Sequence, residues 1–170
     1  INIVFVLGES VRADHLQLNG YERETTPLLS KTENVVSYSD VFSPLTFTAA
    51  SVPQILTDKS IKDYNNNNSY YTVYDVLNNL NIETIWLGNQ NPEKNYLQIV
   101  EKNTSVFLTD KYHSLFSFKN KAYDSILITP FYQAIKRKKH KFTTLQMIGS
   151  HWYYENRYPN KFKVFTPTIK

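Results

Sequence analysis

The sequence predicts an α/β domain built on a largely parallel sheet. Short apolar runs at residues 1–7, 82–87 and 142–148 are each followed by a glycine and then by polar side chains. Continuous runs of this kind are typical of strands buried on both faces of a parallel sheet. Segments with helical spacing lie between them, and alternating strands and helices characterise α/β folds. With 170 residues, the chain is long enough for one domain with a hydrophobic core.

The first part of the chain is predicted to contain one strand and the helix at whose start the chemistry is expected. Residues 1–7 predict a strand buried on both faces. Residues 25–29 resemble the opening of a short helix, and residues 35–42 read as extended chain. This extended chain leads into a helix that starts near Thr48, where Pro53 is early enough to be tolerated.

The rest of the chain continues the alternation. The predicted elements are, in order, a polar surface loop at 65–69, a helix at 70–80, strands at 82–87 and 105–108, a helix at 123–136 and a strand at 142–148. Because proline lacks an N–H and crowds the preceding turn, Pro130 should kink or divide the helix at 123–136.

Composition excludes several classes of protein and site. The chain has no cysteine, which excludes disulfides and Cys-based zinc sites. No run approaches the ~18 apolar residues of a membrane span, and no signal peptide is present, so an anchor or export signal is expected outside this chain. The net charge of +4 suits an anionic membrane surface or phosphate-bearing substrates. The basic cluster at 136–141 lacks interleaved aromatic residues, which favours a solvated helix end over nucleic-acid binding.

The chemistry is expected around the start of the helix near Thr48. Thr46, Thr48 and Ser51 bring three hydroxyls to this point. A hydroxyl oxygen there can accept from the unpaired amides of the first turn. The same amides and the helix dipole also attract phosphate groups. The alternative is an ordinary capped helix without chemistry.

Polar side chains come directly after the predicted strands. Glu9 follows the first strand, Asn89 and Gln90 follow the strand at 82–87, and His151 follows the last strand. Sites in open α/β sheets form beyond the carboxyl ends of the strands. A carboxylate, a hydroxyl and an imidazole on one rim suit a divalent cation and a phosphorylated substrate. A metal beside Thr48 would lower the pKa of its hydroxyl and make it a nucleophile.

Each of these residues also has a structural interpretation. Glu9 could cap a helix after the first strand, and His151 could be a hydrogen-bonded structural histidine. A structural role is favoured for Asp14 and His15, which lie in a polar loop. Lys94 would ordinarily be a solvated surface lysine.

Three motifs are separated along the chain: residues 8–15 (GESVRADH) with residues 18–27 (LNGYERETTP), residues 43–53, and residues 148–159. Together they resemble the motifs of the phosphoethanolamine transferases, sulfatase-like enzymes of the alkaline-phosphatase fold that modify lipid A and other envelope targets. The first motif is similar to the opening of these enzymes, the second to their nucleophile region and the third to their histidine segment. The resemblance runs from residue 1 to residue 165 in the family's order.

The resemblance implies a zinc-assisted, two-step transfer. It implies that Glu9 and Thr48 are zinc ligands and that Thr48 becomes modified with phosphoethanolamine before the group passes to the acceptor. It also implies four side chains around the reacting phosphate: Thr46, Gln90 and Lys94 as substrate-binding residues and His151 as a catalytic residue.

The resemblance further implies an α/β/α sandwich of the alkaline-phosphatase and sulfatase type. Residues 1–170 would be the N-terminal part of its catalytic domain, truncated on the C-terminal side. The implied donor is phosphatidylethanolamine, and the implied acceptor is lipid A or another envelope component, a modification that confers polymyxin resistance. The protein would be a monomer in the bacterial inner membrane, anchored outside this chain, with this domain in the periplasm.

The chain departs from the family pattern in ways that keep two alternatives open. Pro44 and Gln54 stand where relatives commonly have cysteines, so a local disulfide is absent. Trp152 replaces a usual glycine and would narrow the substrate entrance. The family's paired Asp-His zinc ligands and a further histidine would follow residue 170, so this chain alone is expected to be inactive. The alternatives are a sulfatase- or phosphatase-like hydrolase and a non-catalytic fragment without the downstream metal ligands.

Overall fold

The chain divides into two compact units, Ile1–Glu9 with Pro44–Lys170 and the intervening Ser10–Ser43. The computed structural model describes residues 1–43, 45–58, 62, 71–92, 94–109 and 121–168, with residues 94 and 95 described only in their main chain. The predicted loop at 65–69 and the departure at Pro44 lie outside the described residues. The larger unit contains the sheet and all the candidate site residues.

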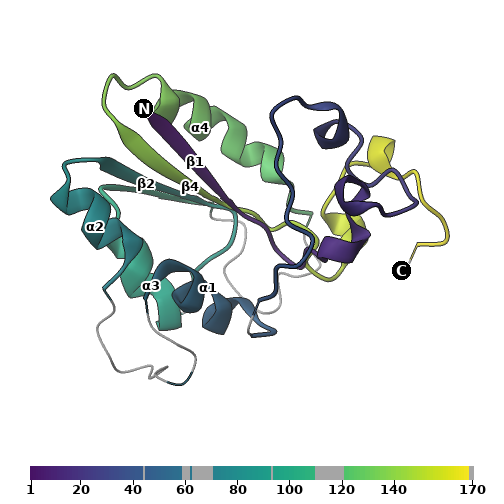
Figure 1. Ribbon diagram of the computed structural model, residues 1–170, viewed down its shortest axis with the longest axis horizontal. Helices are drawn as coiled ribbons and strands as arrows, with labels where there is room; N and C mark the ends of the chain where they lie inside the picture. Colours follow the sequence, from purple (N-terminus) through teal and green to yellow (C-terminus); the bar gives the residue numbers. More distant parts are fainter. Residues whose placement is uncertain (44, 59–61, 63–70, 93, 110–120, 169–170) are drawn as a thin grey trace. The chain divides into compact units, whose positions relative to one another are not determined.

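The sheet has four parallel strands in the order β1-β4-β2-β3 (Figure 1). Its strands are β1 (Asn2–Leu7), β2 (Glu83–Gly88), β3 (Ser105–Leu108) and β4 (Lys141–Gln146). All four predicted strands are present, although β4 ends two residues earlier than expected. Gln146 lies opposite both Leu7 and Gly88, so the carboxyl ends of three strands are level. The segments after these strands therefore emerge at the same edge.

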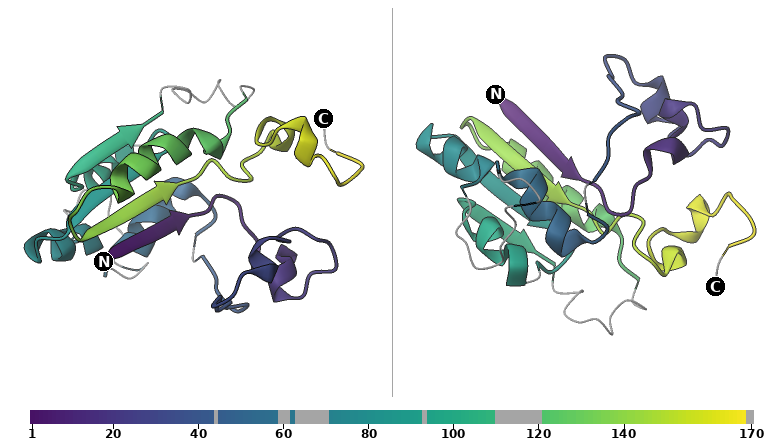
Figure 2. Two further views of the ribbon diagram at one scale, coloured as in Figure 1. Left: turned by 90° about the horizontal axis from the view of Figure 1, so that it is seen from above. Right: turned by 60° about the horizontal axis from the view of Figure 1, so that its bottom comes forward.

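Helices cover both faces of the sheet (Figure 2). The α-helices are α1 (Thr48–Leu56), α2 (Val73–Asn79), α3 (Lys94–Glu101) and α4 (Ile128–Ile135). Alternate residues of β2 face opposite layers: Trp86 joins the cluster formed with α1, α2 and α3, whereas Ile85 and Leu87 join the cluster formed with α4. This confirms the predicted α/β/α arrangement with a mainly parallel sheet.

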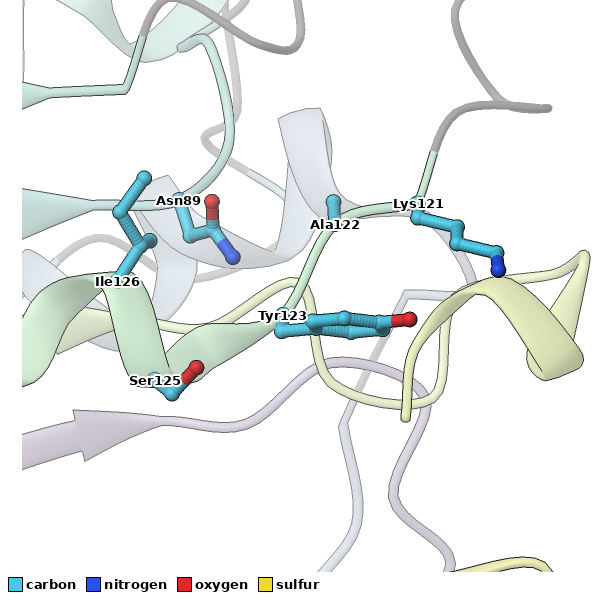
Figure 3. Close-up of a pocket in the computed structure, with 6 residues that line it drawn as sticks. All are labelled: Asn89, Lys121, Ala122, Tyr123, Ser125 and Ile126. Carbon is cyan, nitrogen blue, oxygen red and sulfur yellow. The ribbon is translucent and has the colours of Figure 1, made fainter. Parts of the chain in front are cut away.

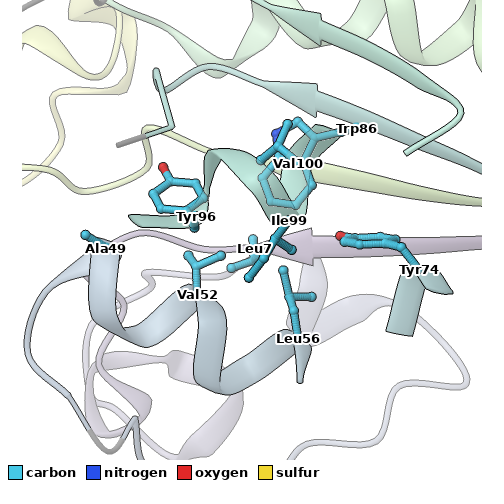
Figure 4. Packing of buried hydrophobic residues seen from close by; sticks show 9 residues of the cluster. All are labelled: Leu7, Ala49, Val52, Leu56, Tyr74, Trp86, Tyr96, Ile99 and Val100. Atoms are coloured by element: carbon cyan, nitrogen blue, oxygen red, sulfur yellow. The ribbon is translucent and has the colours of Figure 1, made fainter. Parts of the chain in front are cut away.

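The larger hydrophobic cluster fixes α1 against the sheet (Figure 4). Ala49, Val52 and Leu56 lie three and four residues apart, so they share one helix face, and each is at most 3% exposed. Trp86 is fully buried and contacts Tyr74 edge to face at 6.1 Å. Burying each large apolar side chain contributes roughly 1.5–3 kcal/mol. This packing holds the first residue of α1, Thr48, at the edge where the strands end. The full cluster is Leu7, Ala49, Val52, Leu56, Tyr74, Trp86, Tyr96, Ile99 and Val100.

Strand β1 is not buried on both faces, contrary to the prediction. Ile3, Val4 and Val6 are 44%, 41% and 55% exposed. In the described part of the chain β1 is an outer strand paired only with β4, and only Phe5 and Leu7 pack against the large cluster. A continuous apolar run identifies a strand, but it does not show whether neighbouring elements cover it.

Two predicted helices also differ from the structure. Residues 25–29 do not form an α-helix, and the helical element at this place is a single 3₁₀ turn, η3 (Leu29–Lys31). The segment 123–136 divides into a 3₁₀ turn, η6 (Asp124–Leu127), followed by α4. Pro130 is the third residue of α4, where its missing N–H would have no intrahelical partner. The division therefore precedes the proline rather than following it.

The basic cluster at 136–141 lies mostly in solvent, as predicted. Helix α4 ends at Ile135, and residues 136–140 are exposed. Lys141 is the exception: it is only 1% exposed, and its ammonium group donates to the main-chain carbonyl of Arg137. A buried cation near the end of a helix stabilises the unpaired carbonyls there.

The unit Ser10–Ser43 consists of loops and short 3₁₀ turns. Thr25 connects two of its segments, because its hydroxyl donates to the carbonyl of His15 (2.7 Å) and accepts from the amide of Gln17 (3.0 Å). Asp14 pairs with Arg12 at 2.6 Å, and the hydrogen bond from Arg12 lowers the pKa of Asp14. These contacts agree with the structural roles expected for Asp14 and His15. The 3₁₀ turns of this unit are η1 (Ala13–His15), η2 (Gln17–Asn19) and η3, and the other unit contains η7 (Tyr154–Asn156) and η8 (Asn160–Phe162) in addition to η6.

Helix α2 begins at Val73, about one turn after residue 70, where the predicted helix begins. A capping box stabilises its N-terminal end. The Thr72 hydroxyl accepts from the amide of Asp75, while the Asp75 carboxylate accepts from the amide of Thr72 (2.6 Å). Asp75 also pairs with Lys102 at 2.6 Å. Burial opposes ionisation of Asp75, but the hydrogen bonds from Lys102 and Thr72 outweigh it and leave its pKa below the ordinary value.

Asp75→Asn is expected to destabilise the protein by about 1 kcal/mol at neutral pH. The lowered pKa makes the effect pH-dependent: the stabilisation is present above the ordinary Asp pKa of about 3.9 and is lost as the pH falls through the lower folded-state pKa. Thermal unfolding of the parent and variant as a function of pH should therefore converge in acid. A difference in melting temperature that stays constant across the acid range would contradict this role.

Candidate active site

Three residues predicted from the sequence meet at the carboxyl edge of the sheet. The carboxylate oxygen Oε2 of Glu9, which follows β1, accepts a hydrogen bond from Thr48 Oγ1 at 2.7 Å. The same oxygen accepts from Gln90 Nε2 at 3.1 Å. Gln90 follows β2 and also donates to the carbonyl of Met147, after β4, at 2.6 Å. The level strand ends and the start of α1 thus assemble a carboxylate, a hydroxyl and an amide.

The hydroxyls at the start of α1 do not cap the helix, contrary to the expectation. The N-cap residue is Phe47, and no side-chain cap occurs among the described residues. Thr48 donates to Glu9, and Ser51 donates to the carbonyl of Leu45 at 3.0 Å. Since the first amides of a helix lack intrahelical partners, this end of α1 presents N–H groups and a positive dipole end beside the Thr48 hydroxyl. Such a helix end suits a phosphate group.

Gly149 lets the turn after β4 pack directly against Glu9. Its φ of +47° lies in the left-handed region, and a Cβ at this position would lie 2.8 Å from the main-chain oxygen of Glu9. The next residue, Ser150, donates its amide to that same oxygen at 3.1 Å. Only glycine combines this conformation with so close an approach. The sharp exit expected from Gly149 is therefore present, and it brings Glu9 and the segment before His151 together.

His151 is half-buried at this edge. Burial lowers the pKa of His151 below its ordinary value, and the cation of Arg157 acts in the same direction, while the Glu9 carboxylate opposes them. Arg157 is 7% exposed and donates to the carbonyls of His151 (3.4 Å) and Trp152 (3.2 Å). A pKa below the ordinary value favours the neutral imidazole at neutral pH. A neutral imidazole near a carboxylate can accept a proton or gain charge when an anion arrives.

The structure gives less detail for the other residues singled out from the sequence. Thr46 is exposed, two residues before Thr48. Lys94 is the first residue of α3, and its side chain lies outside the described residues. Trp152 is 55% exposed and contacts the rings of His151 and Tyr153.

The donor set fits part of a zinc site. Within the described residues, no group of three or more His, Cys, Asp and Glu side chains could hold a metal ion. Glu9 and Thr48 present two oxygen atoms 2.7 Å apart, and zinc accepts carboxylate oxygen as a ligand. Because structural and catalytic zinc sites normally have about four ligands, these two residues would account for about half of one.

The sulfatase family matches the whole chain, residues 1–170. The chain belongs to the sulfatase family. Among curated proteins, this sulfatase-family chain is 31% identical to the phosphatidylethanolamine transferase Mcr-1 of Escherichia coli over 99% of its length and 32% of that protein. It is 32% identical to the phosphoethanolamine transferase EptA of Escherichia coli K12 over 97% of its length and 30% of that protein. The chain therefore spans about a third of these relatives, and the resemblance stated from its motifs is confirmed.

Solved structures show the same fold. The C-terminal periplasmic domain of phosphoethanolamine transferase EptC from Campylobacter jejuni has a TM-score of 0.82 and 26% identity, over 99% of this chain and 52% of that one. The integral membrane lipooligosaccharide phosphoethanolamine transferase EptA of Neisseria meningitidis has a TM-score of 0.79 and 29% identity, and the match covers 99% of this chain and 32% of that one. The C-terminal periplasmic domain of Escherichia coli EptC in complex with Zn has a TM-score of 0.73 and 23% identity, and the match covers 99% of this chain and 51% of that one. In the sulfatase-family chain itself, none of the described helices is long and apolar enough to cross a membrane.

This sulfatase-family chain has a cavity of about 350 Å³ whose lining includes Asn89, the residue that precedes Gln90 (Figure 3). Glu9, Thr48, Gln90 and His151 do not belong to its lining. The residues that line it are Asn89, Lys121, Ala122, Tyr123, Ser125 and Ile126.

Two residues at this edge were absent from the sequence-based prediction. Arg157 supports the main chain of His151, and Asp124 bonds to the turn that precedes it. Asp124 is the second residue of the segment 123–136 predicted as a helix, where an acidic residue is ordinarily interpreted as a favourable partner for the helix dipole. No local pattern in the sequence distinguishes that role from a bond to a distant turn.

Proposed function

We propose that residues 1–170 are the N-terminal part of the catalytic domain of a phosphoethanolamine transferase. The proposed reaction moves phosphoethanolamine from phosphatidylethanolamine to lipid A or another envelope acceptor. The observation that carries the proposal is the Thr48 hydroxyl at the start of α1, 2.7 Å from the Glu9 carboxylate. The names of the relatives Mcr-1 and EptA support the transferred group.

Thr48 acts as the nucleophile in this proposal. Its Oγ1 attacks the donor phosphorus, a new Oγ1–P bond forms, and the bond from phosphorus to the diacylglycerol oxygen breaks. The proton of the hydroxyl leaves toward the Glu9 side, and the diacylglycerol oxygen takes up one proton. An acceptor oxygen then attacks the same phosphorus: a new bond forms between that oxygen and phosphorus, the Oγ1–P bond breaks, and the acceptor gives up its proton as Thr48 regains one. Dividing one difficult displacement into two easier ones is the general advantage of a covalent intermediate.

Zinc is the proposed metal, with Glu9 and Thr48 among its ligands. The Zn complex of the Escherichia coli EptC domain supports this choice. When bound, zinc supplies positive charge that stabilises the negative charge developing around phosphorus. The remaining ligands would come from outside the described residues.

In this proposal, the other side chains bind the phosphoryl group or orient the Glu9 carboxylate. Gln90 bonds to Glu9 and to Met147, so it orients the carboxylate as well as facing the position proposed for phosphate. The α1 amides and the imidazole of His151 provide donors for phosphoryl oxygens. Thr46 and Lys94 are proposed as further substrate contacts.

The proposed location is the periplasmic side of the bacterial inner membrane. One relative of this fold is an integral membrane protein, and another is a C-terminal periplasmic domain. The membrane would thus supply the phosphatidylethanolamine donor, and a segment outside this chain would anchor the enzyme.

The test is a mass measurement on the full-length protein incubated with phosphatidylethanolamine vesicles. The peptide that contains Thr48 should gain one phosphoethanolamine group, and diacylglycerol should appear in equal amount. Zinc chelation should prevent both, and adding the acceptor should discharge the peptide. A hydrolase would instead release free phosphoethanolamine without an acceptor. Transfer to the acceptor with no modified Thr48 peptide at any time would overturn the proposal.

A further inference from the structure

The carboxylate of Asp124 bonds to the main chain of the turn that carries His151. One oxygen, Oδ1, accepts from the amide of Ile148 at 2.8 Å, and the other, Oδ2, accepts from the amide of Gly149 at 2.9 Å. Asp124 comes from the first position of η6, 24 and 25 residues earlier in the chain. Bonds in which an ionised carboxylate accepts are shorter and stronger than neutral ones. One side chain thus holds two consecutive amides of the turn after β4.

Asp124 is itself held by the ends of two other strands. Its Oδ1 accepts from Asn89 Nδ2 at 2.9 Å, and Asn89 Oδ1 accepts from the hydroxyl of Thr109 at 3.0 Å. Asn89 follows β2 and is 2% exposed, and Thr109 follows β3 and is 4% exposed. The buried amide therefore has its donor and acceptor directions fixed on both sides. Such a network orients its members more strictly than single bonds do.

The opposite side of the turn after β4 contacts the main chain of Glu9. Gly149 is in contact with the Glu9 main chain, and Ser150 donates to the Glu9 carbonyl at 3.1 Å. The amide of His151 closes the turn by donating to the carbonyl of Ile148 at 3.1 Å. The turn is therefore clamped between the Asp124 carboxylate and the backbone of Glu9.

Side-chain packing leaves room beside the Asp124 segment. The cavity of about 350 Å³ is lined by Asn89 and by both chain neighbours of Asp124, Tyr123 and Ser125 (Figure 3). The segment is also held by the buried side chain of Leu127 and by the amide of Ala122, which donates to the carbonyl of Asn156 at 3.0 Å. Among these contacts, the hydrogen bonds of Asp124 are the ones that join the segment to the amides of the turn after β4.

We propose that Asp124 is a positioning residue for the reaction: by fixing the turn at 148–149, it sets the position of His151 relative to Glu9 and Thr48. The inference rests on the proposed function for the chemistry at those three residues. Asp124 itself acts through the turn and does not touch the substrate. A displacement of the reacting groups by about 1 Å can cost ~10²-fold in rate.

Asp124→Asn in the full-length protein tests this role. The variant keeps the size of the side chain but replaces one acceptor oxygen with an NH₂ group. Because three N–H donors converge on the carboxylate, at least one of them then faces another donor. We expect the amides of Ile148 and Gly149 to exchange with deuterium roughly 10-fold faster. We also expect kcat to fall by roughly 10²-fold with little change in KM.

Asp75→Asn is the matched control, since it is the same substitution in the capping box of α2, outside the site. It should lower the melting temperature without changing kcat or the exchange of residues 148 and 149. If Asp124→Asn does not fold, Asp124→Glu keeps the carboxylate but displaces it by one methylene, and the same two readouts apply with smaller changes.

Two results would overturn the proposal: unchanged exchange at 148 and 149, or faster exchange with an unchanged kcat. Faster exchange together with a reduced kcat supports it, provided that Asp75→Asn shows neither. The exchange measurement does not depend on the assigned chemistry. If Thr48→Ala proves fully active, the proposed function fails, whereas the exchange result still reports whether Asp124 holds the turn.

Discussion

Replacing Thr48 with alanine is expected to reduce phosphoethanolamine transfer by roughly 10³-fold or more in the full-length protein. The substitution removes the oxygen that would form the covalent bond to phosphorus. It also removes the hydrogen bond to Glu9 Oε2 at 2.7 Å. Transfer to the acceptor is measured directly, and the modified Thr48 peptide should be missing from the mass spectrum. Thr48→Ser keeps the oxygen and should retain part of the activity.

The loss should not come from unfolding. Thr48 is the first residue of α1 and only half-buried, while Ala49, Val52 and Leu56 supply the buried face of the helix. Alanine is also compatible with a helical first turn. The melting temperature of Thr48→Ala should therefore stay close to that of the parent.

Thr57→Ala provides a matched control at the other end of the same helix. Its hydroxyl donates to the carbonyl of Pro53 at 2.8 Å, so the substitution also removes one hydroxyl hydrogen bond from α1. Transfer by Thr57→Ala should be near the parent level. Undiminished transfer by Thr48→Ala, or an equal loss in both variants, would contradict a nucleophilic Thr48.

The parts of the fold that were predicted correctly are those set by local pattern. The strands at 82–87 and 105–108 and the helix start at Thr48 were identified because apolar runs, glycines and hydroxyl clusters are short-range signals. Helix α3 was missed because its stripe of Tyr96, Ile99 and Val100 is short and is interrupted by polar residues. The exposure of β1 was also missed, because it depends on which strands lie beside it and not on its own residues.

In the candidate site, too, features set by local pattern were predicted, and features that depend on distant residues were missed. Glu9, Gln90 and His151 could be placed at one edge because parallel strands deliver the residues beyond their carboxyl ends to the same side of the sheet. Their assignment to zinc and phosphate depended on the resemblance to a family. Asp124 was missed because its importance lies in bonds to residues 24, 25 and 35 positions away. The sequence near Asp124 does not encode these partners, which come together only when β2 and β4 pair.

His151→Ala is expected to reduce turnover by ~10²–10⁴-fold, the range commonly found for a general acid or base. The imidazole lies half-buried at the edge where Glu9 and the start of α1 meet, and the Glu9 carboxylate influences its pKa. An anionic phosphoryl group at this place would favour the protonated imidazole, which could then donate to a phosphoryl oxygen or to the leaving group. Steady-state transfer and thermal unfolding of the full-length variant measure the two effects separately.

The structural alternative for His151 makes a different prediction. The turn is held by main-chain contacts of Gly149 and Ser150 with Glu9, by the Asp124 carboxylate, and by Arg157, which donates to the carbonyl of His151. Removing the imidazole should therefore change the melting temperature little. His140→Ala is the matched control, because His140 is exposed and precedes β4 at the opposite edge of the sheet.

His151→Gln separates binding from proton transfer. Glutamine can still donate one hydrogen bond to phosphate but cannot exchange a proton near neutral pH. If the imidazole only binds, His151→Gln should recover much of the activity that His151→Ala loses; if it transfers a proton, both variants should be similarly impaired. A His151→Ala protein that unfolds, while its folded fraction keeps full specific activity, would show that the histidine is structural.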